Sequence, residues 1–109
     1  MNRTVHILER ARADVDAIFN WLVGRSLQGA VSWYLAFHQA IDRIASAAES
    51  YGEAPEAHPL NRQLRQAPFK TRRGRVYRIV FEIVENDILV LRVRGPGQAP
   101  LRRQDVPTE

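Results

Sequence analysis

The sequence predicts an α+β fold in which a hairpin of two helices packs on one face of a small, mostly antiparallel sheet. Three observations favour this architecture. A short β-branched segment opens the chain, two neighbouring stretches have helical apolar spacing, and two alternating apolar runs flank a short turn. The length of 109 residues suits one domain, so we expect a single unit over residues 1–109 with an irregular tail from about residue 95.

The first half should form a strand followed by the helical hairpin. Residues 3–8 are short and β-branched, which predicts a strand. Apolar residues at helical spacing begin near Glu9, and Gly24 is expected to end this helix. A second helix should run from about 27 to 50, and the short link at 24–26 indicates that the two helices are antiparallel. Its apolar stripe consists of Ala30, Tyr34, Phe37, Ile41, Ile44 and Ala48, widened by Trp33 and Ala45.

The second half should supply the sheet that these helices cover. Glycine and proline make residues 51–59 a loop, and Pro68 marks the weak strand within 60–71 as an edge strand or a bulge. The strongest strand signals in the chain are the alternating runs 75–84 and 88–94. Together the three strands predict an antiparallel meander.

A three-residue loop of Glu85, Asn86 and Asp87 would place the bulky apolar residues of both hairpin strands on the same face. The pairs expected from it are Ile79 with Val93, Phe81 with Leu91, Ile83 with Leu89, Arg78 with Arg94 and Val80 with Arg92. The opposite face would then carry Arg78, Arg92 and Arg94. These guanidiniums are either compensated by Glu82 and acids of the tail, left in solvent, or kept for an anion.

Charge is unevenly distributed along the chain. Residues 1–58 carry a net charge of −2 and residues 59–109 a net charge of +6, and fifteen of the sixteen basic residues are arginine. This segregation suggests an anionic partner, either nucleic acid or an acidic protein, and the alternative that stays open is an Arg-rich surface that is merely solvated. There is no cysteine, and no segment approaches the roughly 20 apolar residues of a membrane span, so we expect a cytoplasmic protein.

Several segments together resemble the RelE/ParE family, the toxins of type II toxin–antitoxin systems. The matching segments are 13–18 and 36–44 in the predicted helices, Leu64-Arg65, the strand 77–83 and the strand 88–94. The similarity covers about residues 3 to 98, and its most specific part is a Tyr-Arg-Ile-aliphatic-aromatic strand followed by an aliphatic-Arg strand. The family fold agrees with the architecture predicted above.

One branch of this family cleaves messenger RNA on the ribosome without a metal ion. The resemblance implies that its catalytic set includes an arginine of the Tyr-Arg strand, lysines of the preceding strand, a basic residue after the last strand and often a C-terminal Tyr or His. Arg78 matches the first and Lys70 lies near the second. The third position falls near Gly97 or Gln98, and no Tyr or His follows Tyr77, so the set is incomplete.

The other branch poisons DNA gyrase and lacks that set, which agrees better with this chain. We therefore expect a growth-inhibitory gyrase poison that is neutralised by an acidic antitoxin. One alternative is a ribosome-dependent mRNA endoribonuclease with Arg78, Lys70 and Arg94 as catalytic residues. A further alternative is a non-toxic module that binds only the antitoxin.

The expected partners are an antitoxin and either gyrase or ribosome-bound mRNA, without a membrane, a cofactor, a metal ion or a small-molecule substrate. The three histidines show no spacing typical of a metal site. The two tryptophans are expected to pack in the core, but Trp21 lies off the main helical stripe, so it is also a candidate for an antitoxin groove. The residues expected to contact the target or the antitoxin are Arg65, Arg73, Arg78, Arg92, Arg94 and Trp21.

Overall fold

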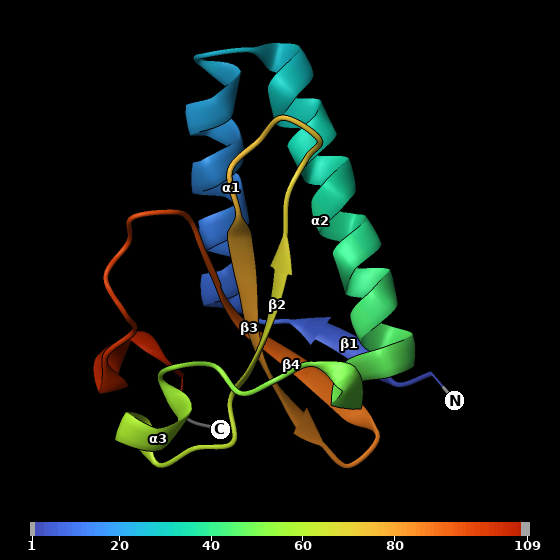
Figure 1. Ribbon diagram of the computed structural model, residues 1–109, viewed down its shortest axis with the longest axis vertical. Coiled ribbons are helices and arrows are strands. Elements are labelled where there is room, and N and C mark those ends of the chain that lie inside the picture. Colours follow the sequence, from blue (N-terminus) through green and yellow to red (C-terminus); the bar gives the residue numbers. More distant parts are fainter. Residues whose placement is uncertain (1, 108–109) are drawn as a thin grey trace.

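The computed structural model describes residues 2–107 and confirms the α+β architecture (Figure 1). In chain order the elements are β1 (Thr4–Ile7), α1 (Glu9–Val23), α2 (Leu27–Ala47), a 3₁₀ turn (Ala48–Ser50), α3 (Ala57–Leu60), β2 (Arg65–Phe69), β3 (Tyr77–Val84), β4 (Asp87–Arg94) and a 3₁₀ turn (Arg103–Asp105). The sheet order is β1-β4-β3-β2. β1 runs parallel to β4 and the other neighbours are antiparallel, so the sheet is mixed. None of the described helices is long and apolar enough to cross a membrane.

The helical hairpin forms where the apolar spacing predicts it. α1 ends at Val23, and the hydroxyl of Ser26 caps α2 by accepting a hydrogen bond from the Gly29 N–H at 3.0 Å. The inward side of α2 buries Trp33 and Phe37 against the sheet. Tyr34 was expected in this stripe but lies on the outer side of the helix, where it is 42% exposed. One apolar face of α2 therefore covers the sheet. The stripe predicted from the sequence was too wide, because it included Tyr34.

The hairpin of β3 and β4 is confirmed, but its predicted loop and part of its register are wrong. Only Glu85 and Asn86 separate the strands, and Glu85 adopts a left-handed backbone conformation with φ of 55°. Near the open end the expected pairs hold, including Arg78 with Arg94. A bulge at Leu91 then shifts the register, so that Phe81 pairs with Val90 and not with Leu91. Toward the turn, Ile83 pairs with Ile88 instead of Leu89.

The bulge matters because it changes which side chains face the helices. An extra residue in one strand reverses the alternation beyond it. Val93, Val90 and Ile88 all join Phe81 in the core beneath the helices, whereas Leu91 faces the opposite side. Both Phe81 and Leu91 are buried, but on opposite faces of the sheet.

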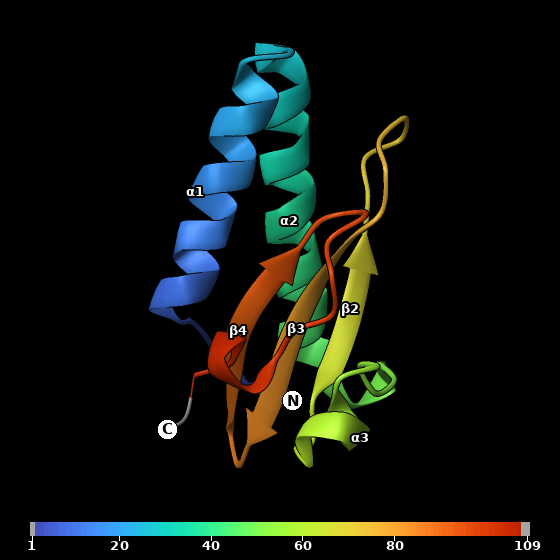
Figure 2. The ribbon, with the colours of Figure 1, turned by 90° about the vertical axis from the view of Figure 1, so that its left-hand side faces the viewer.

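A second apolar core covers the face of the sheet that is turned away from the helices. Figure 2 shows α3 and the C-terminal tail in front of the sheet, with α1 to the left of the sheet and α2 behind it. Leu101 and Val106 of the tail are buried there against the sheet. The complete cluster consists of Ala54, Ala57, Leu60, Leu64, Val80, Leu91, Leu101 and Val106. The expected open basic face is therefore a covered face, and its arginines lie at the edge of a small core.

Candidate functional site

Arg78, a residue predicted to contact the target, is bound within the chain. Its guanidinium donates to both carboxylate oxygens of Glu56, at 2.9 Å from Nη1 to Oε1 and by a second contact from Nη2 to Oε2, and Nη1 also donates to Gln66 at 3.3 Å. Glu56 is only 2% exposed, and its Oε2 also accepts the Leu101 N–H at 3.0 Å. Sequence reasoning treated Arg78 as a surface arginine, whereas the structure pairs it with a buried carboxylate of the same chain. Its role in binding a partner stays a prediction.

The Glu56 carboxyl is held in its ionised form by these donors. Burial raises its pKa, but the hydrogen bonds from Arg78 and from the Leu101 N–H outweigh burial, so the pKa lies below its ordinary value. One carboxylate thus joins α3's N-terminal end, strand β3 and the tail. A charge this deeply buried needs its partners, because an unpaired buried carboxylate is strongly unfavourable.

Arg92 forms the second internal pair, with Asp14 of α1. Its Nε donates to Oδ2 of Asp14 at 2.7 Å and its Nη2 to Oδ1 at 2.9 Å, which is the bidentate geometry that suits arginine and carboxylate. The same carboxylate accepts the Val93 N–H at 2.9 Å, and Arg92 Nη1 donates to the Asp105 carbonyl at 2.9 Å. The hydrogen bond to Asp14 raises the pKa of Arg92 further above its ordinary value. This pair fixes the first helix and the tail to β4.

Arg94 lies across from Arg78 but has no carboxylate partner among residues 2–107. Its Nη2 donates to the Ala99 carbonyl, and its buried Nε has no acceptor in the described part of the chain. Burial lowers its pKa, and the positive charge of Arg92 adds to this effect. Together, Arg78, Arg92 and Arg94 were expected to be balanced by Glu82 and acids of the tail or kept for an anion. Glu56 and Asp14 balance two of the three instead.

Glu82 and Arg65 bind other parts of the chain, and Lys70 is exposed. Glu82 pairs with Arg62 through two hydrogen bonds of 3.0 and 2.8 Å. Arg65 donates to the carbonyls of Glu49 and Tyr51, so it supports the turn after α2. Lys70 lies just beyond β2 and is exposed, with no side-chain partner in the described part of the chain.

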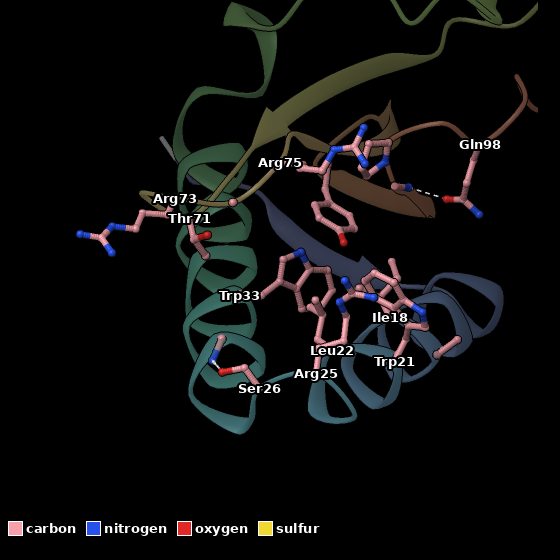
Figure 3. Close-up of a pocket in the computed structure, with 16 residues that line it drawn as sticks. Ile18, Trp21, Leu22, Arg25, Ser26, Trp33, Thr71, Arg73, Arg75 and Gln98 are labelled. Atoms are coloured by element: carbon pink, nitrogen blue, oxygen red, sulfur yellow. Dashed lines mark hydrogen bonds between the residues drawn. The ribbon is translucent and has the colours of Figure 1, made fainter.

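A concave surface lies on the other side of the molecule, between the tip of the helical hairpin and the open end of the sheet. We call it the groove. Its volume is about 800 Å³, and most of its lining surface is apolar. It is lined by Ala17, Ile18, Trp21, Leu22, Arg25, Ser26, Gly29, Trp33, Thr71, Arg73, Gly74, Arg75, Tyr77, Gly95, Pro96 and Gln98. Figure 3 shows side chains of the helices facing those of the β2–β3 loop across this space.

The charges at the groove differ in kind from those under the tail. Three arginines and no carboxylate line it. Arg25, Arg73 and Arg75 are exposed and form no side-chain hydrogen bond or ion pair with any residue in 2–107. The Arg25 guanidinium lies 4.8 Å from the centre of the Trp21 ring, a cation–π arrangement. Arg73 points away from the other labelled side chains in Figure 3.

The comparisons with known proteins give one family. The sequence matches the ParE toxin family of type II toxin–antitoxin systems (parDE) over residues 5–100. The chain belongs to the ParE toxin family. No curated protein and no solved structure matches it. Membership confirms the resemblance seen in the sequence and makes the chain a toxin of a type II toxin–antitoxin system.

In this ParE-family toxin the predicted contact residues fall into two groups. Arg65, Arg78, Arg92 and Arg94 are engaged with the chain's own carboxylates or carbonyls, whereas Trp21 and Arg73 line the groove. Their roles in binding stay predictions. Sequence reasoning missed Arg25 and Arg75 as groove residues. The i, i+4 spacing of Trp21 and Arg25 at a helix end could have indicated Arg25, because it places both side chains on one face.

Proposed function

We propose that this toxin arrests growth in the cytoplasm by poisoning DNA gyrase and that an acidic antitoxin neutralises it. The observation that carries the proposal is the pairing of Arg78 with Glu56. A metal-independent ribonuclease needs a cation free to stabilise the charge that develops on the phosphate. An arginine bound on both nitrogens by a buried carboxylate is poorly placed for that role, since binding phosphate would leave Glu56 buried and unpaired.

The groove supports the second half of the proposal. An acidic antitoxin segment would meet arginines there that no carboxylate of the described chain neutralises, together with exposed apolar surface at Trp21. Opposite charges of this kind accelerate association, and a large, exposed aromatic side chain supplies contact area. Exposed aromatic surface in a groove is also costly to leave uncovered, which favours a partner that stays bound.

The activity is best tested with purified protein on both possible targets in parallel. In one reaction the toxin is added to gyrase and supercoiled DNA, and trapped cleaved-DNA complexes are counted. In the other it is added to a translating ribosome extract, and the reporter mRNA is mapped for cuts. The proposal expects cleaved DNA complexes, intact mRNA, and loss of the effect when the protein encoded beside the toxin is added.

Two results would contradict the proposal. Cut mRNA with unaffected gyrase would identify an endoribonuclease, the first alternative. Binding to the adjacent gene's product without any effect on gyrase, mRNA or cell growth would identify a module that only binds an antitoxin. Arg43→Gln, on the exposed side of α2 and remote from the groove, serves as the control for nonspecific effects of removing an arginine.

A further inference from the structure

We propose that the groove is also a binding site for a small amphipathic anion, a molecule with a compact apolar body and a carboxylate or sulfonate head. This inference rests on the geometry of the groove and does not depend on the toxin's target. A volume of about 800 Å³ lies within the ~300–1,000 Å³ of ordinary ligand sites. Such sites are mostly apolar with a few placed polar groups, and the groove has this composition.

Arg25 is the group that would hold the anionic head. Its guanidinium lies over the Trp21 ring and has no carboxylate or carbonyl partner among residues 2–107, in contrast to Arg78 and Arg92. Because no group of the described chain occupies its N–H donors, they stay available to an oxyanion. Arg75 adds positive charge from the opposite wall. With no acidic side chain in the lining, the groove should reject a cation of the same shape.

Trp33 supplies the second, independent observation. It is only 3% exposed, and its indole Nε1–H is buried without any hydrogen-bond acceptor in the described chain. Buried tryptophan N–H groups ordinarily find a partner, because leaving a donor unpaired costs about 1–3 kcal/mol. Trp33 lies among the groove's lining residues in Figure 3, so an acceptor oxygen of a bound ligand could satisfy this donor after a small side-chain shift.

The apolar body would lie against the helix side of the groove. Ile18 and Leu22 of α1 face it from one side, and the ring of Tyr77 lies 5.4 Å from that of Trp33 on the other. These side chains are already part of the packed hairpin, or rest on it, so they need little ordering when a ligand binds. An alkyl chain or a single aromatic ring suits the apolar character of this lining better than a sugar or a nucleotide, which would leave many hydroxyl groups unpaired.

Three compounds with one apolar chain and different heads test the proposal: octanoate, octan-1-ol and octylammonium. Both tryptophans of the chain, Trp21 and Trp33, line the groove, so the intrinsic fluorescence of the unmodified protein reports occupancy. Calorimetry provides an independent binding isotherm. For a ligand of this size we expect octanoate to bind saturably with a Kd of roughly 0.1–1 mM. It should bind at least about tenfold more tightly than octylammonium, with octan-1-ol in between.

Variants show whether binding occurs in the groove. Arg25→Gln should weaken octanoate about fivefold or more and leave octan-1-ol within twofold, because only the charge is removed. Ala17→Phe, at an exposed helix position that lines the groove, should reduce binding of all three compounds by filling the space. Arg43→Gln removes an exposed α2 arginine outside the groove and should change nothing. Thermal unfolding confirms that each variant is folded.

Three outcomes would overturn the proposal. The first is equal affinity for the three compounds, and the second is octanoate binding that Ala17→Phe leaves unchanged. The third is no saturable binding of octanoate at concentrations up to about 10 mM, because a Kd above this value means negligible affinity. Because the readout is binding alone, a toxin that proves inactive on gyrase could still pass this test. Conversely, a gyrase poison could fail it, so the two proposals are judged separately.

Discussion

Arginines on the two sides of the molecule have opposite surroundings. Under the tail, Arg78 and Arg92 each meet a carboxylate in bidentate geometry, and those carboxylates also accept backbone N–H groups of Leu101 and Val93. At the groove, Arg25 meets no carboxylate of residues 2–107 and lies over an aromatic ring. The difference teaches that net basic charge does not locate a binding surface. In a chain with fifteen arginines, those that could attract a partner are those that the fold leaves uncompensated.

Asp14 offers the strongest expected effect on the tail side. Asp14→Ala removes both hydrogen bonds to Arg92 and the acceptor of the Val93 N–H, and it leaves a mostly buried guanidinium without its partner. Breaking one side of such a pair should lower the free energy of unfolding by about 2–3 kcal/mol. Denaturant unfolding measures this value.

Asp16 provides the matched control two residues along the same helix. It is exposed and has no hydrogen-bond or ion-pair partner among residues 2–107, so Asp16→Ala should change the unfolding free energy by less than about 0.5 kcal/mol. Similar losses of unfolding free energy for the two variants would mean that the Asp14–Arg92 pair stabilises the fold no more than an exposed charge does. The contrast between the arginines under the tail and those at the groove would then weaken.

Low pH should destabilise the contacts under the tail by protonating Glu56. The expected loss of unfolding free energy is smaller than the loss for Asp14→Ala. Because the folded-state pKa of Glu56 is lowered, its ionised form stabilises the fold above about pH 4.5, and this contribution is lost as the pH falls through the folded-state pKa. Unfolding free energies measured between pH 6 and pH 3 should therefore fall less steeply for Glu56→Gln than for the unmodified chain. Parallel curves for the two proteins would show that Glu56 is not held ionised by Arg78 and Leu101.

The sequence predicts the helical hairpin and the β3–β4 hairpin because both depend on local patterns of apolar residues. The bulge at Leu91 lies beyond such patterns, since it is set by burial on both faces of the sheet. One available signal was the uninterrupted apolar run Ile88–Leu91, which is typical of a strand covered on both sides. The loop prediction instead assumed one solvated face, and the register error followed from that assumption.

The candidate site was harder to predict than the fold. Arg78 and Glu56 are 22 residues apart, and Arg92 and Asp14 are 78 apart, so no local pattern joins them. The tail reads as irregular, yet its scattered apolar residues Leu101 and Val106 are buried. Trp21 was predicted as an antitoxin contact because it lies off the helical stripe; it lines the groove, and its role in binding stays a prediction. Such a departure from the packing pattern is the kind of signal a single sequence can supply.

The most direct test compares one substitution on each side, Arg78→Gln and Arg25→Gln, by denaturant unfolding under identical conditions. Arg78→Gln should lower the unfolding free energy by about 2 kcal/mol or more, because Glu56 is left buried without its main partner. Arg25→Gln should change it by less than about 0.5 kcal/mol, since Arg25 is exposed and unpaired in the described chain. Equal changes, or a larger loss for Arg25→Gln, would contradict the division between arginines that hold the fold and arginines left free for a partner.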